Sequence, residues 1–192
     1  MRNSIIPSLA TLLLMGMSSV AFAQDSTEGE GETTADKTFP VSEAQVVPYV
    51  KETHGAWDVR CVKAPEADEQ CNLQLLLKNE DGTAVAEMNM QALPAGGEAA
   101  SGVTFVTPLG TLLTIPMTFQ IEQGLINRYP FNWCEAAGCV LRFGLTQGQI
   151  DQMKSGTSAS VQLVSIVSPN EPIQLTIPLE GFSAAWTAVG GQ

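Results

Sequence analysis

The stretch Arg128-Tyr-Pro-Phe-Asn-Trp-Cys-Glu-Ala-Ala-Gly-Cys-Val-Leu-Arg-Phe143 brings two cysteines, alternating aromatic side chains and the start of an apolar run close together. Gly138 can adopt a positive φ without steric cost, so the chain can reverse direction just before Cys139. The residues from Cys139 to Phe143 favour a β-strand. The stretch therefore predicts a tight loop, closed between Cys134 and Cys139, that leads into a strand.

The N-terminus has the order of segments that is typical of a secretory signal peptide. A positive start at Arg2 is followed by an apolar run over residues 5–17 and by an A-x-A cleavage pattern at residues 21–23. The apolar run is too short for a stable transmembrane span, and no other stretch is long enough. We predict that residues 1–23 are removed and that the exported, mature chain begins at Gln24.

All cysteines of the chain lie in this exported part, namely Cys61, Cys71, Cys134 and Cys139. An even number of cysteines in an exported chain is typical of disulfides, whereas a zinc site, the alternative, commonly uses closer cysteine spacing. Of the possible pairings we predict the two local ones, Cys61–Cys71 and Cys134–Cys139. A crossed bridge occurs in immunoglobulin-type domains, but their tryptophan lies between the two cysteines in sequence, whereas Trp57 precedes them.

The chain is acidic, with a formal net charge of −11 at pH 7. This charge argues against binding nucleic acid or anionic lipid through general electrostatics. Residues 24–47 combine acidic residues with Ser, Thr and Gly and have few large apolar side chains, so we predict a disordered leader that folding does not need. A docking tail for a basic partner is the alternative. The folded domain is expected over residues 48–192.

Short runs with strand character follow, separated by turn signals such as Asp81-Gly82. We expect strands over residues 57–62, 72–78, 85–92, 103–107, 112–115, 117–121, 125–128, 140–143, 161–167 and 173–178. The side chains expected to point into the core from the first two strands are Trp57, Val59, Cys61, Leu73, Leu75 and Leu77. Pro116 cannot donate to a ladder and indicates a sheet edge or a bulge. The pattern predicts an all-β fold, a β-sandwich.

Two short helices complete the prediction. Thr146 and Gln149 fit a capping box, and Gly156 is a stop signal, so one helix is expected between them. A second is expected over residues 183–189. The side chains expected to face inward from the two helices are Ile150, Met153, Phe182, Ala185, Trp186 and Val189.

The sequence offers little that would support catalysis. His54 is the only histidine, which excludes metal sites that need several histidines. No nucleophile is near it in sequence and no G-x-S-x-G motif occurs, so we expect a surface residue. No glycine-rich phosphate loop occurs, and no two carboxylates stand out as a glycosidase pair. We expect no catalytic residues, no metal and no cofactor.

The aromatic residues Tyr129, Phe131 and Trp133 alternate beside the cysteine loop, and Arg128 and Arg142 flank it. Burial habits favour at least two of the three aromatics as core residues. The functional alternative is a rigid contact surface for a partner, in which the arginines would bind carboxylates. These five residues form the candidate interaction surface.

Several motifs taken together carry a family resemblance: Gly55-Ala-Trp-Asp-Val-Arg-Cys61 with Cys71, Pro108-Leu-Gly110, Arg128-Tyr-Pro-Phe131 with the Cys134–Cys139 loop, and Ile177-Pro-Leu-Glu-Gly-Phe182. Over residues 55–189 the chain resembles the invasion-associated locus B family, exported proteins of alphaproteobacteria. The resemblance implies an immunoglobulin-like β-sandwich in the periplasm, at the outer membrane or outside the cell. It also implies a link to host-cell invasion and virulence, and it transfers no catalytic residues.

These observations favour a non-enzymatic, exported binding protein that acts on an unidentified protein or envelope partner. They leave its oligomeric state open. A periplasmic chaperone or envelope-maintenance factor, using the sheet edge expected near Pro116, is one alternative. A hydrolase that uses scattered carboxylates is the other.

Overall fold

The computed structural model describes residues 47–63, 68–79 and 81–192. The predicted signal peptide and almost all of the predicted leader lie outside the described residues. The elements in chain order are β1 (Tyr49–His54), β2 (Trp57–Val62), β3 (Gln70–Lys78), β4 (Ala84–Ala92), β5 (Ser101–Thr107), β6 (Met117–Ile121), β7 (Asn127–Tyr129), β8 (Trp133–Glu135), β9 (Gly138–Leu145), α1 (Gln147–Ser155), β10 (Ser158–Ser165), β11 (Ser168–Pro178) and α2 (Phe182–Ala188).

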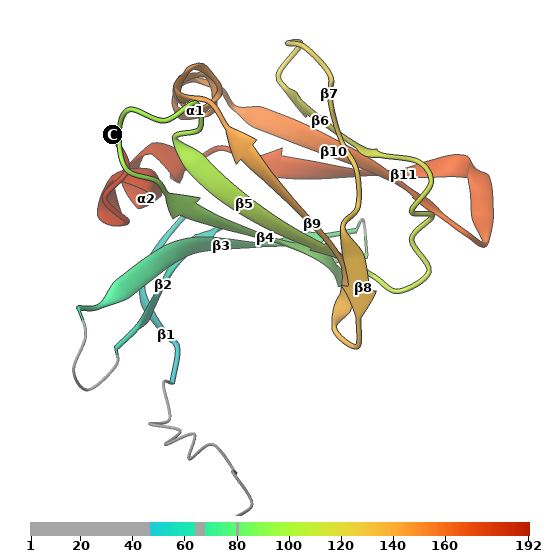
Figure 1. The fold of residues 1–192 in the computed structure, drawn as a ribbon, viewed down its shortest axis with the longest axis horizontal. Helices are drawn as coiled ribbons and strands as arrows, with labels where there is room; N and C mark the ends of the chain where they lie inside the picture. Colours follow the sequence, from blue (N-terminus) through green and yellow to red (C-terminus); the bar gives the residue numbers. More distant parts are fainter. Residues whose placement is uncertain (1–46, 64–67, 80) are drawn as a thin grey trace, which may run out of the picture. The chain divides into compact units, whose positions relative to one another are not determined.

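The strands form two antiparallel sheets that enclose one core (Figure 1). The larger sheet has seven strands in the order β1-β2-β3-β4-β5-β9-β8, and the smaller has four in the order β11-β10-β6-β7. Most neighbours in the larger sheet are consecutive in sequence, because short turns return the chain directly alongside the strand just completed. The predicted all-β sandwich with short helices is confirmed.

Strand alternation explains which side chains fill the core. Trp57, Val59 and Cys61 are all buried on β2, and the intervening residues of that strand are only partly covered, because successive side chains point to opposite faces of a sheet. The Trp57 indole Nε1 donates to the Pro178 carbonyl oxygen at 2.9 Å. Its ring meets the edge of Phe182, with ring centroids 5.0 Å apart. Trp57 therefore joins the larger sheet to the end of β11 and to α2.

Both helices form at the predicted positions. The Thr146 side chain accepts from the Gln149 backbone, and the Gln149 side chain accepts from the Thr146 backbone N–H at 2.9 Å, which completes the capping box. The side chains that these helices bury are Ile150, Met153, Phe182, Ala185 and Trp186. The helices therefore cover the core with the side chains that the pattern predicted.

Both local disulfides are confirmed. Cys61 and Cys71 are cross-strand partners on β2 and β3, with Cα atoms 4.1 Å apart. Cys134 and Cys139 are partners on β8 and β9, with Cα atoms 3.9 Å apart. Every cysteine is therefore bonded, and none remains as a thiolate ligand for zinc.

Three expectations about strands were wrong. Residues 112–115 form turns instead of a strand, because the backbone there bonds locally, as in the bond from the Ile115 N–H to the Leu112 carbonyl at 3.3 Å. Pro116 does not mark a sheet edge, since it precedes β6, which lies inside the smaller sheet between β10 and β7. The last two strands were expected over residues 161–167 and 173–178. The turn between them is instead at residues 166–167, so Pro169 and Pro172 lie within β11. β11 is an edge strand, and its pairing with β10 is interrupted between Ser168 and Ile173, so both prolines lie where the ladder is broken.

Candidate functional site

Two of the aromatic residues in the candidate interaction surface contribute to the core. Tyr129 and Phe131 are half-buried and pack against it. The Tyr129 ring stacks on Phe143 of β9, with centroids 3.8 Å apart and an interplanar angle of 14°. Burial raises the pKa of the Tyr129 hydroxyl above its ordinary value. The Tyr129–Phe143 stack therefore joins the edge strand β7 to β9.

Trp133 differs, because 40% of its surface is exposed at the start of β8. The guanidinium of Arg142, on the adjacent strand β9, lies 5.1 Å from the centre of the Trp133 ring. That distance is within the range of a cation–π contact. The Arg142 backbone N–H also donates to the Asn132 side chain at 2.7 Å, just before β8. The structure therefore joins Trp133 and Arg142 into one exposed unit on a hairpin closed by a disulfide.

Arg128 belongs to a different surface. It lies on β7, in the smaller sheet, opposite Thr118 of β6. Arg142 lies on β9, in the larger sheet, opposite Thr104 of β5. The two arginines project from different sheets, so the carboxylate-binding pair considered from the sequence is not assembled by one sheet face.

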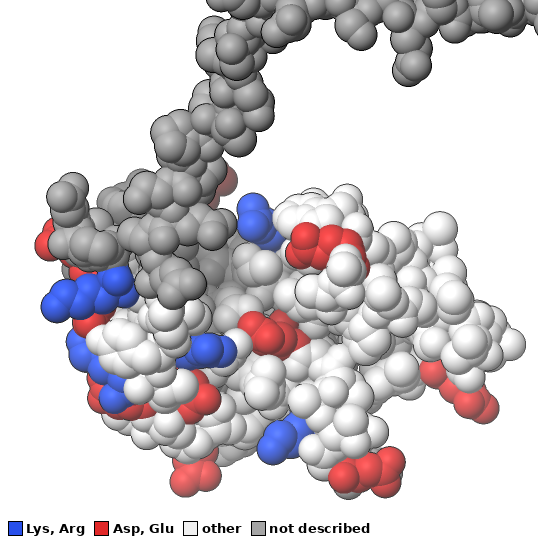
Figure 2. All heavy atoms as spheres, turned by 90° about the horizontal axis from the view of Figure 1, so that it is seen from below, with Lys and Arg blue, Asp and Glu red and all other residues white. Residues whose placement is uncertain are grey.

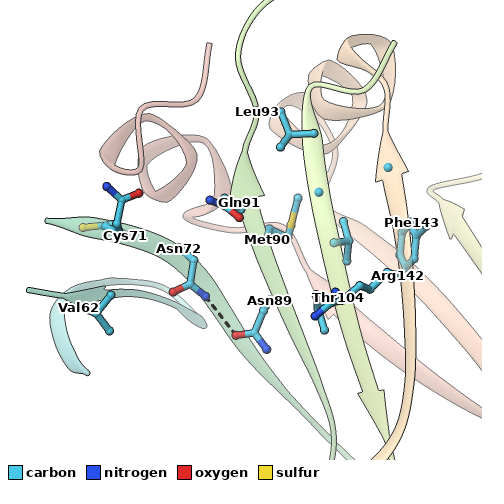
Figure 3. A pocket seen from close by; sticks show the side chains of 14 residues that line it. Val62, Cys71, Asn72, Asn89, Met90, Gln91, Leu93, Thr104, Arg142 and Phe143 are labelled. Carbon is cyan, nitrogen blue, oxygen red and sulfur yellow. Dashed lines mark hydrogen bonds between the residues drawn. The ribbon is translucent and has the colours of Figure 1, made fainter. Parts of the chain in front are cut away.

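A cavity of about 720 Å³ lies over the outer face of the larger sheet, beside Arg142. Figure 3 shows Asn72, Asn89, Thr104 and Arg142 projecting from successive strands along it. Gly102 and Gly144 pair across β5 and β9 at one end of it, where Leu93 and Ala99 pack over them: an added Cβ would lie 3.8 Å from a Leu93 methyl group and 2.7 Å from the Ala99 Cβ, respectively. We call this cavity, together with the adjoining Trp133, the Arg142 trough. Sequence reasoning found its arginine and tryptophan but missed the remainder, which comes from strands far apart in the chain.

One side of the trough is braced by a chain of hydrogen bonds across β2, β3 and β4. Arg60 donates to Gln74 at 2.8 Å, and Gln74 donates to Glu87 at 2.7 Å. Asn89 donates to the same Glu87 oxygen at 2.7 Å and accepts from Asn72 at 3.2 Å. Glu87 thus accepts two hydrogen bonds on one carboxylate oxygen, and these side chains hold one another in place.

The other side of the trough keeps polar side chains free. Within the described part of the chain, the side chains of Gln91, Thr104 and Arg142 make no hydrogen bond. An amide, a hydroxyl and a guanidinium offer donors and acceptors to a ligand. The trough can therefore bind a polar partner, and its arginine can bind a carboxylate.

Other polar clusters in the described ranges have structural partners. His54 Nε2 lies 2.9 Å from a Glu52 carboxylate oxygen on the edge strand β1. Glu69 accepts from Lys51 at 2.6 Å and from the Tyr49 hydroxyl, and these hydrogen bonds hold the pKa of Glu69 below its ordinary value. These contacts brace β1 and assemble no nucleophile with a base.

In the described ranges, no helix is long and apolar enough to cross a membrane.

Comparison with known proteins identifies the family. Residues 57–190 match the family described as invasion associated locus B (IalB) protein. Two proteins named invasion protein B homologs, from Brucella abortus strain 2308 and biovar 1 strain 9-941, are each 26% identical over 136 residues, covering 71% of this chain and 76% of theirs.

A solved structure has the same fold. The crystal structure of invasion associated protein B from Bartonella henselae superimposes with a TM-score of 0.60 and 23% identity, covering 72% of this chain and 92% of that one. The family match spans both sheets, both disulfides and both helices. The chain therefore belongs to the invasion associated locus B family.

Proposed function

We propose that this chain is an exported, non-enzymatic interaction protein that binds a macromolecular partner through the Arg142 trough. Export rests on the signal-peptide pattern at residues 1–23. The observation that carries the binding role is the contact between Arg142 and the exposed Trp133, 5.1 Å apart.

Tryptophan and arginine are the residue types most enriched where binding energy concentrates. The hairpin that carries Trp133 is closed by the Cys134–Cys139 bridge. A rigid hairpin loses little conformational entropy when a partner binds, which favours affinity.

The trough sets limits on the partner. The Arg142 guanidinium presents a planar fork of donors that suits a carboxylate. The exposed Trp133 ring offers an apolar surface beside that guanidinium. A partner that presents an acidic group beside an apolar or aromatic surface fits these features best.

The names of the relatives suggest where such a partner would be found. The Brucella abortus proteins are named as invasion protein homologs, and the Bartonella henselae structure is of an invasion associated protein. We extend this to the present chain as a role in contact with a host cell.

The chaperone alternative required a free sheet edge near Pro116, but β6, which follows Pro116, is an interior strand. For the hydrolase alternative, the carboxylates beside the trough in the described residues, Glu69 and Glu87, both accept hydrogen bonds from neighbouring side chains.

The test is binding of the mature chain to host-cell surfaces and to bacterial envelope extract, followed by crosslinking. Trp133→Ala and Arg142→Ala should each weaken capture roughly tenfold or more. Arg128→Ala is the matched control, because it removes an exposed arginine from the other sheet. Capture that survives both trough variants, or turnover of a glycan or peptide by the purified chain, would overturn the proposal.

A further inference from the structure

A second surface of the molecule is apolar and projects into solvent. It is formed by two turns, at residues 108–115 and 166–167, and we call it the apolar tip. Its large exposed side chains are Leu109 at 61%, Leu113 and Ile115 at 42%, Ile166 at 58% and Val167 at 84%. Figure 1 shows the β10–β11 turn at one extremity of the domain, with the segment after β5 beside it.

The two turns are joined by backbone hydrogen bonds. The Leu112 N–H donates to the Val164 carbonyl at 2.7 Å, and the Ile166 N–H donates to the Gly110 carbonyl at 2.8 Å. The Val167 N–H donates to the Ser165 hydroxyl at 3.3 Å. Because these polar groups are satisfied inside the tip, its transfer out of water would not leave them unpaired.

The tip also lacks charge. No charged residue occurs over residues 99–121 or over residues 155–170, although the chain carries 29 acidic and basic residues in all. In Figure 2 the end of the molecule with this turn is mostly uncharged, with an acidic group at its margin, and most charged side chains lie towards the other end. Glu171 follows the tip on β11.

The residue composition of the apolar tip distinguishes between the partners that could cover it: another protein, the predicted leader or a lipid layer. Protein-binding surfaces are enriched in Trp, Tyr, Met and Arg and carry a polar rim, whereas the large apolar side chains exposed here are all aliphatic. The predicted leader is acidic and polar in composition and is a poor match for an aliphatic surface. A lipid layer accepts aliphatic side chains that project from an uncharged end of the molecule.

We propose that the apolar tip inserts into the hydrocarbon boundary of an uncharged or zwitterionic lipid layer and orients the domain on it. Zwitterionic lipid is specified because the chain has a net charge of −11, which an anionic surface would repel. Insertion of a few aliphatic side chains gives reversible attachment, since the affinity scales with the apolar area that is buried.

The experiment is flotation of the mature chain with phosphatidylcholine vesicles. Val167→Asp and Leu109→Asp should each reduce the vesicle-bound fraction roughly tenfold, because a charge replaces an aliphatic side chain that would otherwise leave water. Leu125→Asp is the matched control: Leu125 is 88% exposed at the β6–β7 turn and receives the same charge. This control should bind like the unchanged protein.

A fluorescent reporter provides the second measurement. In Val167→Trp the emission should shift to the blue and be quenched by lipids brominated on their acyl chains, whereas Leu125→Trp should show neither effect. Failure of the unchanged chain to float, or equal binding by Val167→Asp, would overturn the proposal. So would self-association in solution that Val167→Asp abolishes, because the occupant would then be a second copy.

Discussion

Gly55 and Gly181 lie face to face between the β1–β2 turn and the start of α2. A Cβ atom on Gly55 would lie 2.6 Å from the Glu180 carbonyl oxygen, and one on Gly181 would overlap the His54 carbonyl oxygen. Both glycines have positive φ, +63° and +82°. This contact brings two of the motifs that carry the family resemblance together, although they are distant in sequence, and it places Phe182 against Trp57.

Gly181→Ala should lower the free energy of unfolding by roughly 1–3 kcal/mol, because the new methyl group meets backbone atoms that cannot move independently. Gly82→Ala is the control: Gly82 has a similar φ of +79° but nothing within 4 Å of the added Cβ. Denaturant titration of both variants separates close approach from backbone preference. Equal losses in the two variants would mean that the contact has no energetic role.

Glu122 links the end of β6 to the start of β10. Its carboxylate accepts from the Ser158 N–H at 3.0 Å and from the N–H and hydroxyl of Thr157, and these hydrogen bonds hold its pKa below the ordinary value of 4.5. A carboxyl group whose pKa is lower in the folded than in the unfolded protein contributes its full stabilisation above pH 4.5, the ordinary value. This contribution is lost as the pH falls through the lower pKa of the folded state. Glu122→Gln should therefore destabilise the protein at pH 7 and progressively less in acid.

The measurement is the unfolding midpoint of Glu122→Gln and the unchanged protein from pH 7 down to pH 3. Glu171→Gln serves as the control, since Glu171 is exposed and makes no hydrogen bond within the described residues. A Glu122→Gln difference that stays constant across the pH range would contradict the assigned role of the carboxylate.

Trp57→Phe should cost about 1–3 kcal/mol, because the Pro178 carbonyl loses its buried donor and the smaller ring leaves space. Trp133→Phe should change the free energy of unfolding by no more than about 0.5 kcal/mol, because Trp133 is 40% exposed. Thermal unfolding monitored by circular dichroism compares the two. Similar effects of the two substitutions would contradict the assignment of Trp57 as the link between the larger sheet, β11 and α2.

The two disulfides should differ in accessibility. Each has one buried cysteine, Cys61 or Cys139, but the partner Cys134 is exposed, whereas the partner Cys71 is only partly so. A limiting amount of reductant should therefore open the Cys134–Cys139 bridge first, because the attacking thiolate needs access to a sulfur. Alkylation followed by peptide mass spectrometry gives the order. Earlier labelling of Cys61 and Cys71, or a peptide that crosses the two pairs, would refute it.

Several features follow from the sequence because they depend on neighbouring residues. Period-two alternation assigned Trp57, Val59 and Cys61 to one face, and the Thr146–Gln149 box placed the start of α1. The disulfides were predictable for the same reason, since each pair closes a short segment between adjacent strands. These features depend on the geometry of residues that are close in sequence, so the order of residues is enough to predict them.

Tertiary structure alone decided the rest. The edge strand β1 was missed because most of its side chains are exposed and show no alternation, and the position of β6 inside a sheet depends on which strands flank it. The contact between Arg142 and Trp133 and the pairing of Gly102 with Gly144 depend on strand register. Register is fixed only when both sheets close over the shared core, so these pairs have no signature in either segment taken by itself.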